Sequence, residues 1–312
     1  MKAVLGRWRL EKPDLMELEN FTLKGYISLL RYLKQVYKIV PACSILRKTF
    51  PYLILRHDVD VSPSAALKMA KVENSLGVKS TYFFMFSNRF YNLLEGNNPC
   101  ILKQILKLGH EIGLHYHPSQ FRVYNKDLGK TLELQVKLLE HLTGKRVYSI
   151  SRHGPWDKDP FASIRGYINA NHPYFRGDLF IHDSCRIWTP AQGLRVLIDD
   201  SPKRVQLLTH PENWTEKILD RESLREIYLR KAMKGFKEGI AGWLREPLQN
   251  VGNYVNCNAK ENGCNAHKSS FALKLQRELN YYNILFRYYM VNTSLGWYFH
   301  LLLESFRALK RA

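Results

Sequence analysis

Two aspartates stand at the end of an apolar run, in Leu53-Ile-Leu-Arg-His-Asp-Val-Asp60. Such a run is typical of a buried strand, in which side chains alternate between two faces. Asp58 and Asp60 would therefore leave the strand on the same side, close enough to share a cation and a substrate. Solvated aspartates in an ordinary turn before Ser62 and Pro63 are the alternative interpretation.

Histidines gather at the end of a second strand-like run, Gly109-His-Glu-Ile-Gly-Leu-His-Tyr-His117. Neutral imidazole and carboxylate are the usual ligands of a catalytic zinc ion or a similar divalent ion. His115 and His117 share a strand face, whereas His110 precedes the strand and is equally consistent with a structural role. Together the two runs predict a metal site with an open position for water or substrate.

These two motifs, with Ser80-Thr-Tyr-Phe-Phe84 between them, resemble the polysaccharide deacetylase family, the NodB-homology domain of carbohydrate esterase family four. The likeness is greatest to the divergent branch encoded among surface-polysaccharide biosynthesis genes, and it spans about residues 50 to 215. The resemblance implies that Asp58 is the catalytic base and Asp60 a metal ligand. It also implies that His115 is the first metal-binding histidine.

One family ligand is missing from this chain. The family carries a second ligand histidine four positions after the first, where this sequence has Ser119. His117 is the nearest replacement, and His153, within Ser151-Arg-His-Gly-Pro155, is its competitor. We expect one of these two rings in the metal site. If both point elsewhere, a degenerate barrel without turnover is the better interpretation.

Three further motifs extend the resemblance. The third family motif places Arg152 beside Asp58, where its charge would hold the carboxylate. The fifth resembles Val205-Gln-Leu-Leu-Thr-His210, an apolar strand ending in a histidine, and implies that His210 is the general acid. The fourth is the weakest match: His182-Asp-Ser184 would supply an acid that orients a catalytic histidine.

Strands and helices alternate from residue 52 onward. Strands are predicted at 52–57, 79–86, 111–116, 146–151, 178–183 and 204–209, with helices at 63–76, 99–108 and 126–142. This alternation predicts an α/β fold with a parallel sheet. Each motif lies where a strand ends, and the carboxyl ends of barrel strands meet at one mouth. The family resemblance implies a distorted (β/α)7 barrel with an N-terminal helix and a C-terminal helical extension.

Three regions are expected along the chain. Residues 1–50 form an N-terminal helical segment with an amphipathic helix at 21–38, and residues 51–215 form the deacetylase-like barrel core. Residues 216–312 form a helical extension with a polar linker near 249–270. The tail from 271 to 312 is aromatic and basic. It either packs on the barrel or docks on a protein or a membrane surface, as basic amphipathic segments do.

Charge and cysteine content narrow the classes of partner and location. The 312 residues include 47 basic and 28 acidic ones, for a net charge of +19, which favours anionic partners. Nucleic acid is not expected, because zinc-finger spacing and aromatic-basic motifs are missing. Five cysteines, an odd number without a framework, argue against a disulfide-built secreted protein. With no signal-peptide core at the N-terminus, we expect a cytoplasmic protein with peripheral membrane contact through its tail.

The sequence therefore predicts a hydrolase, dependent on a divalent metal such as zinc, that removes an N-acyl group from an amino sugar. The group is expected to be acetyl, and the setting bacterial surface-polysaccharide biosynthesis. Cleavage of an ester or a phosphoester is an alternative, since Asp and His sites serve those reactions too. A non-catalytic barrel that binds glycan or scaffolds a biosynthetic complex is another. Four aromatic residues near the motifs would stack on a sugar or belong to the core: Tyr82, Phe84, Trp156 and Trp214.

Overall fold

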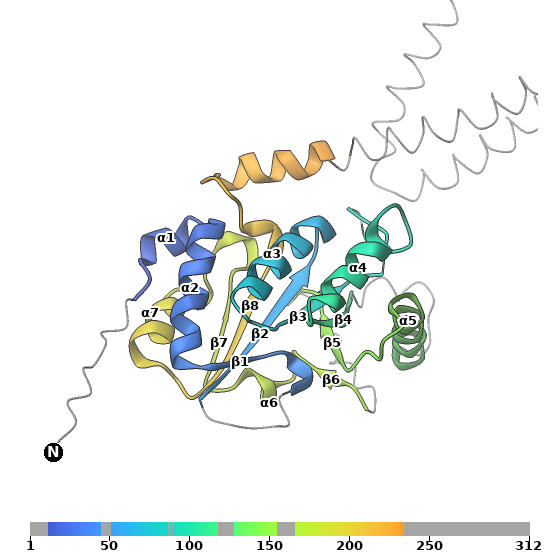
Figure 1. Cartoon of the computed structure of the whole chain (residues 1–312), viewed down its shortest axis with the longest axis horizontal. Helices are drawn as coiled ribbons and strands as arrows, with labels where there is room; N and C mark the ends of the chain where they lie inside the picture. The colour runs from blue at the N-terminus through green and yellow to red at the C-terminus, as the bar shows by residue number, and fades with distance from the viewer. Residues whose placement is uncertain are drawn as a thin grey trace, which may run out of the picture. The chain divides into compact units, whose positions relative to one another are not determined.

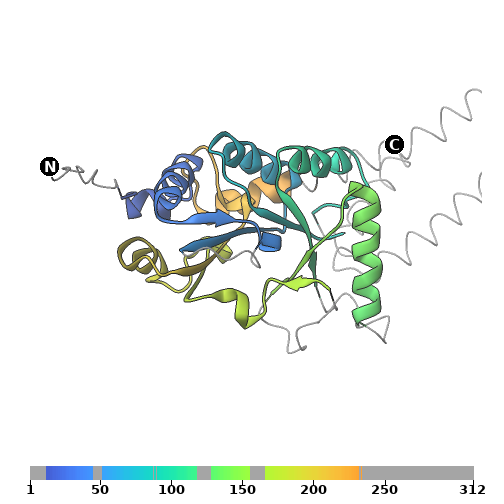
Figure 2. The same ribbon diagram turned by 60° about the horizontal axis from the view of Figure 1, so that its bottom comes forward.

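The described part of the chain folds into a curled parallel sheet with helices packed along its outer face (Figures 1 and 2). The computed structural model describes residues 12–44, 51–86, 88, 90–117, 128–154, 166–231 and 233. All of them lie within Met1–Phe236, the first of two units into which the chain divides. The predicted linker at 249–270 and the tail from 271 fall outside the described residues.

The sheet is parallel at every pairing between named strands. Its strands run in the order β6-β5-β4-β3-β2-β8-β7, with β1 also paired to β2. They are β1 (Lys38–Val40), β2 (Tyr52–Val59), β3 (Thr81–Phe84), β4 (Glu111–Tyr116), β5 (Ser149–Arg152), β6 (Ile168–Asn169), β7 (Leu179–His182) and β8 (Arg204–Thr209). Within the described residues the sheet stays open between its edge strands β6 and β7. The predicted distorted (β/α)7 barrel is confirmed, and β1 and β6 are strands that the sequence did not predict.

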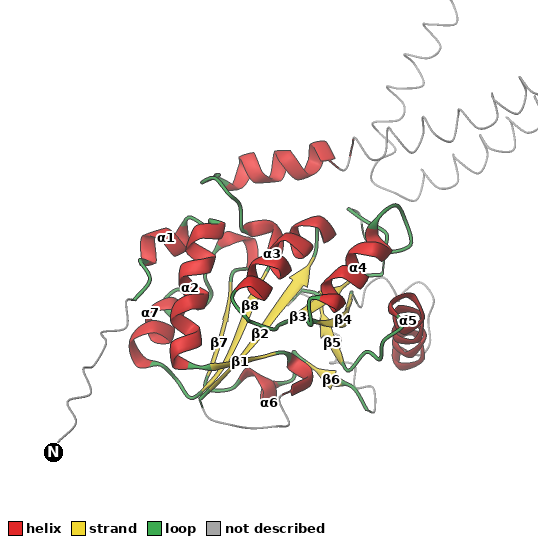
Figure 3. Cartoon of the chain, in the orientation of Figure 1, coloured by secondary structure: helices red, strands yellow, loops and turns green. Residues whose placement is uncertain are grey.

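Helices occupy most connections between strands (Figure 3). They are α1 (Leu15–Glu19), α2 (Leu23–Val36), α3 (Pro63–Ser75), α4 (Asn98–Lys107), α5 (Leu128–Thr143), α6 (Pro173–Arg176) and α7 (Gly193–Arg195). Short turns of helix are η1 (Ala42–Ser44), η3 (Ser184–Arg186), η4 (Val196–Asp200) and η5 (Pro211–Asn213), and residues 221–231 are also helical. Among the helices that the structure describes, none is both long and apolar enough to span a membrane.

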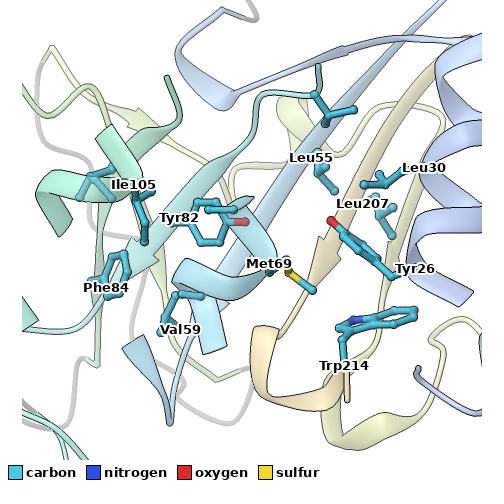
Figure 4. Close-up of a cluster of buried hydrophobic side chains, with 14 of the residues drawn as sticks. Tyr26, Leu30, Leu55, Val59, Met69, Tyr82, Phe84, Ile105, Leu207 and Trp214 are labelled. Atoms are coloured by element: carbon cyan, nitrogen blue, oxygen red, sulfur yellow. The ribbon is translucent and has the colours of Figure 1, made fainter. Parts of the chain in front are cut away.

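The two faces of β2 serve different purposes. Leu55 and Val59 point outward into the main hydrophobic core, where they pack with the helices (Figure 4). Ile54 points inward, into a smaller core at the bottom of the barrel. Because side chains alternate along a strand, Asp58 also faces inward, toward the barrel mouth. The outer face of β2 thus contributes to the main core, and its inner face brings Asp58 to the barrel mouth.

Aromatic residues near the motifs belong to the outer core. Tyr82 and Phe84 are fully buried, and Trp214 is 4 % exposed. Their rings pack among aliphatic side chains between the sheet and the helices (Figure 4). These three residues therefore form core and not a sugar-stacking surface, and Trp156 lies outside the described residues.

A close approach inside the barrel requires glycine on β4. A Cβ atom on Gly113 would lie 2.4 Å from the Phe83 ring and 2.9 Å from the Ser149 carbonyl oxygen. Only a residue without a side chain fits between these neighbours. The Phe83 ring can then cover the floor of the barrel beneath the next inward-facing residue of β4, His115.

The N-terminal helices pack on the loop that follows β8. Leu23 N donates to the Thr215 carbonyl oxygen at 2.8 Å, and Thr215 N donates to the Phe21 carbonyl oxygen at 3.0 Å. The Phe21 ring also stacks on Trp188, with centroids 5.6 Å apart. Within the first unit, the predicted N-terminal segment therefore supports the loop after His210.

Candidate metal and catalytic site

Asp60, His115 and His153 meet at the mouth of the barrel and form a group that can hold a metal ion. Oδ1 of Asp60 lies 3.2 Å from Nε2 of His115 and 3.2 Å from Nδ1 of His153. The two ring nitrogens lie 3.1 Å apart. Ligands about 2.0 to 2.1 Å from a tetrahedral zinc ion are roughly 3.3 Å from one another. One ion therefore fits these three atoms after small shifts.

The ends of strands β2, β4 and β5 bring the three candidate ligands together. Asp60 directly follows β2, His115 lies in β4, and His153 directly follows β5. His115 pairs in register with Ser151, and His153 N donates to the Tyr116 carbonyl oxygen at 2.7 Å. The parallel pairing of β4 and β5 thus carries His153 beyond the strand end and back toward His115.

Hydrogen bonds fix which nitrogen of His115 faces the site. Nδ1 lies 2.9 Å from the Ser151 carbonyl oxygen. Because a carbonyl oxygen only accepts, Nδ1 carries the hydrogen, and the Nε2 lone pair is left for a metal. His153 presents its Nδ1 instead. The two imidazoles would therefore bind an ion through different ring nitrogens.

The protonation chemistry of this group also suits a cation. Burial raises the pKa of Asp60, but the close contacts with the His115 and His153 rings and the positive charges of those rings outweigh burial and hold it well below its ordinary value. Burial lowers the pKa of His153, but the contact with Asp60 outweighs burial, so that the pKa lies above its ordinary value. Among the described residues, the buried Oδ1 of Asp60 receives no hydrogen bond of ordinary geometry. A divalent ion would satisfy this oxygen and displace protons from the rings.

The other two histidines of the second motif lie outside the group. The His117 ring is tilted against that of His153, with centroids 5.1 Å apart. His110 lies on the outer face of the sheet, where its Nε2 is 3.0 Å from the Ala70 carbonyl oxygen. His153 is thus the histidine that the structure groups with Asp60 and His115, and His110 has a structural position. Ser119 lies outside the described residues.

Asp58 sits beside the metal group, with its carboxylate buried. The hydroxyl of Ser151 donates to its two oxygens at 3.2 and 3.3 Å, and Nη2 of Arg56 lies 3.4 Å from Oδ2. The same Oδ2 is 3.8 Å from Nε2 of His115. Arg56, only 1 % exposed, therefore places a buried cation beside this carboxylate.

The predicted pairing of Arg152 with Asp58 stays a prediction. Ser151 and His153 both face the site, and strand alternation places the residue between them on the opposite face. The backbone N of Arg152 donates to Oδ1 of Asn171 at 2.7 Å. Sequence reasoning missed Arg56, although the same alternation, read backward from Asp58, indicates it.

His210 is held by Asp183, from the motif that matched the family least well. Oδ1 of Asp183 accepts from the backbone N of His210 at 2.9 Å and lies 2.7 Å from its Nδ1, while Oδ2 accepts from Nε1 of Trp214 at 2.9 Å. Burial lowers the pKa of His210, but the hydrogen bond and the charge of Asp183 raise it to about 10. Nε2 of His210 lies 3.8 Å from Oδ2 of Asp60.

Two further ionisable residues near the site, Glu212 and His182, were assigned no role of their own from the sequence. Burial and the negative charge of Asp60 raise the pKa of Glu212 to about 8. Burial and the positive charge of His210 lower the pKa of His182. Both residues adjoin predicted positions, at the ends of β8 and β7, but only the folded chain shows that Glu212 is buried and His182 partly buried beside the site.

No family model matches the chain, and no curated protein matches it. Similarity to solved structures is limited. The Xyl-CE4 domain of a multidomain xylanase from the hindgut metagenome of Trinervitermes trinervoides is 17 % identical, with a TM-score of 0.35 over 60 % of this chain and 83 % of that one. A chitin deacetylase from the fungal pathogen Colletotrichum lindemuthianum is 14 % identical, with a TM-score of 0.37 over 62 % and 87 %.

A third similar structure is the wild-type form of BA3943, described as a CE4 family pseudoenzyme from Bacillus anthracis. It is 16 % identical, with a TM-score of 0.34 over 61 % of this chain and 61 % of that chain. Similarities of this size do not transfer an activity to this chain, since function belongs to the site and not to the fold.

Proposed function

We propose that this chain is a metal-dependent hydrolase that removes an acyl group, acetyl in the simplest case, from the nitrogen of an amino sugar. The observation that carries the proposal is the group of Asp60, His115 and His153, with Asp58 and His210 beside it. One carboxylate and two imidazoles with an open position suit zinc best. A bound divalent ion would polarise the acyl carbonyl and acidify a water molecule.

Asp58 is the general base in this proposal. Its carboxylate takes a proton from the attacking water while the new carbon–oxygen bond forms at the acyl carbon. The buried cation of Arg56 and the hydroxyl of Ser151 both contact the carboxylate of Asp58 and fix its orientation. We therefore assign to Arg56 the role that the sequence predicted for Arg152.

His210 is the general acid. With a pKa of about 10 it carries a proton at neutral pH, and Asp183 accepts from Nδ1, so that Nε2 is the donor toward the site. As the carbon–nitrogen bond breaks, this proton passes to the sugar nitrogen, because an unprotonated amine is a poor leaving group. The products are a free amine on the sugar and a carboxylate.

The ligand geometry supports catalysis over a purely glycan-binding barrel. That alternative arose from the missing histidine at Ser119, and Nδ1 of His153 now stands 3.2 Å from Asp60 in the place of a third ligand. A protonated His210 also favours amide cleavage over cleavage of bonds with better leaving groups. A cytoplasmic role in bacterial surface-polysaccharide biosynthesis is proposed on the sequence resemblance alone.

The proposal is tested by metal analysis followed by amine release. Protein purified without chelator should contain one divalent ion per chain. It should then release amine from at least one member of a panel of free, nucleotide-linked, lipid-linked and polymeric N-acetylated amino sugars. Dialysis against a chelator should stop the release, and added zinc should restore it. Metal-loaded protein that releases no amine, or that cleaves O-acetyl esters or phosphoesters in preference, would contradict the proposal.

A further inference from the structure

A second cluster of ionisable side chains lies behind the site, on the outer face of β2. Its centre is Glu73 of α3, which is fully buried. The carboxylate accepts hydrogen bonds from the hydroxyls of Ser80 at 2.6 Å, Tyr82 at 2.8 Å and Tyr26. Figure 4 shows the hydroxyl ends of Tyr26 and Tyr82 pointing toward one another across this space.

His57 connects Glu73 to strand β8. Its Nε2 lies 2.8 Å from Oε1 of Glu73, and its Nδ1 lies 2.7 Å from Oγ1 of Thr209. His57 and Thr209 are register partners of the β2–β8 pairing. The His57 ring packs on the Tyr82 ring, with centroids 4.4 Å apart. We call the chain of contacts Glu73, His57 and Thr209 the back link.

The back link joins the two strands one residue before their catalytic groups. His57 precedes Asp58, and Thr209 precedes His210. Elsewhere the outer face of these strands is apolar, as at Leu55. An apolar pair at the positions of His57 and Thr209 would need no polar partners. Burying the polar side chains of His57 and Thr209 therefore costs desolvation free energy that packing alone does not require. Such local exceptions concentrate at functional sites.

Glu73 places a buried negative charge at one end of the back link. Burial raises its pKa, but the charge and hydrogen bond of His57, with further help from His110 and Ser80, hold it down at about 2. Glu73 is therefore an anion at any working pH, and its Oε1 lies beside one ring nitrogen of His57. The imidazole has only two nitrogens, so the other is directed at the hydroxyl of Thr209.

We infer that Glu73, His57 and Thr209 are positioning residues that hold the end of β8 against the end of β2, so that His210 faces the acyl group beside Asp58. This inference rests on the proposed function. In the structure, Nε2 of His210 lies 3.8 Å from Oδ2 of Asp60, the residue that follows β2. A displacement of about 1 Å in a catalytic group can cost roughly a hundredfold in rate.

Replacing Thr209 tests the inference. Thr209→Val removes the hydroxyl and keeps the branched shape, and Thr209→Ser keeps the hydroxyl. We would measure kcat and KM for the N-acetyl amino sugar and for p-nitrophenyl acetate, whose leaving group needs no proton from His210. Thr209→Val should lower kcat for the amide by about ten- to a hundredfold, with the KM, the ester rate and the bound metal unchanged. Thr209→Ser should restore the amide rate.

Tyr82→Phe is the matched control. It removes a hydroxyl from the same buried cluster but leaves His57 and Thr209 intact. This variant should unfold at a lower temperature and keep the wild-type ratio of amide to ester turnover. The inference is overturned if Thr209→Val keeps the wild-type ratio, or if Tyr82→Phe lowers the ratio as much as Thr209→Val does.

A spectroscopic readout separates failure of this inference from failure of the proposed function. If the wild type releases no amine, the proposed function is wrong, and the back link is then judged from the NMR resonances of the His210 ring. These should move in Thr209→Val and stay in place in Thr209→Ser and Tyr82→Phe. His210 resonances that are identical in all four proteins would overturn the positioning role.

Discussion

Two carboxylates on opposite faces of the sheet, one fully buried and one partly buried, are surrounded by similar groups yet differ in how their hydrogen-bonding capacity is satisfied. Glu73 on the outer face and Asp60 on the inner face each contact two or more histidines, and each has a pKa below its ordinary value. Glu73 also accepts hydrogen bonds from three hydroxyls. Within the described residues, Oδ1 of Asp60 receives no hydrogen bond of ordinary geometry.

The difference teaches what distinguishes a structural carboxylate cluster from a metal-binding one. The hydroxyls around Glu73 are donors that complete its shell within the protein. Around Asp60 the neighbours are ring nitrogens that stand 3.1 to 3.2 Å from one another and from the carboxylate oxygen, as ligands around an ion do. We therefore propose that a cation completes the inner cluster, whereas hydroxyls already satisfy the carboxylate of the outer cluster.

The largest expected effect is on metal binding. Asp60→Ala, His115→Ala and His153→Ala should each remove the bound divalent ion, with affinity falling by more than about a hundredfold, because each deletes a direct ligand. Glu73→Gln should retain one ion per chain. Metal content by plasma emission spectroscopy decides the matter. His117→Ala is the matched control and should keep the ion. Full metal content in all three alanine variants would contradict the assignment of the inner cluster as the metal site.

Asp58→Asn should have the next largest effect, on turnover alone. The amide is isosteric but cannot accept the proton of the attacking water, so amide hydrolysis should fall by about 10² to 10⁴ while the metal stays bound. Steady-state kinetics with metal analysis of the same sample measures both. Turnover near that of the wild type would exclude Asp58 as the base.

Glu73→Gln should act on stability and its dependence on pH. The folded pKa of Glu73 is about 2, below the ordinary 4.5, so the stability it contributes is complete above about pH 4.5 and is lost as pH falls toward 2. The shift corresponds to stabilisation on the order of 3 kcal/mol. Urea unfolding between pH 2.5 and 6 should show a flatter acid slope in the variant. Equal slopes in both proteins would mean that Glu73 is not held as an anion.

The smallest effect concerns the alkaline limb of activity. Asp183 raises the pKa of His210, so the acid form persists to high pH in the wild type. Asp183→Asn should move the alkaline fall of kcat/KM to lower pH and reduce amide turnover at pH 8 by roughly tenfold. Activated esters should be spared. An unchanged alkaline limb would show that His210 does not act as the acid under the control of Asp183.

The order of elements was predictable because long apolar runs with clear alternation mark the central strands. Strands β1 and β6 were missed, since they have only 3 and 2 residues and exposed or half-exposed side chains. Pairing with β2 and with β5 creates them. Such short segments carry no periodic signal of their own, and tertiary contacts decide their conformation.

Within the site, residues at strand ends were easier to foresee than their partners. Asp60 and His115 follow from the position of the motifs, whereas the choice between His117 and His153 depends on how β5 curves past β4. Spacing along the chain does not encode that curvature. Strand alternation would have predicted that Arg56 faces the site with Asp58. It was missed because a buried arginine is an exception within an apolar run.

Anomalous diffraction at the zinc absorption edge tests the central claim most directly. Crystals of the wild-type protein grown with zinc should show one anomalous peak about 2 to 2.5 Å from Oδ1 of Asp60, Nε2 of His115 and Nδ1 of His153. The outer cluster around Glu73 should show none. A peak at other residues, or no peak between these three atoms in a zinc-soaked crystal, would contradict the metal centre and the hydrolase proposed on it.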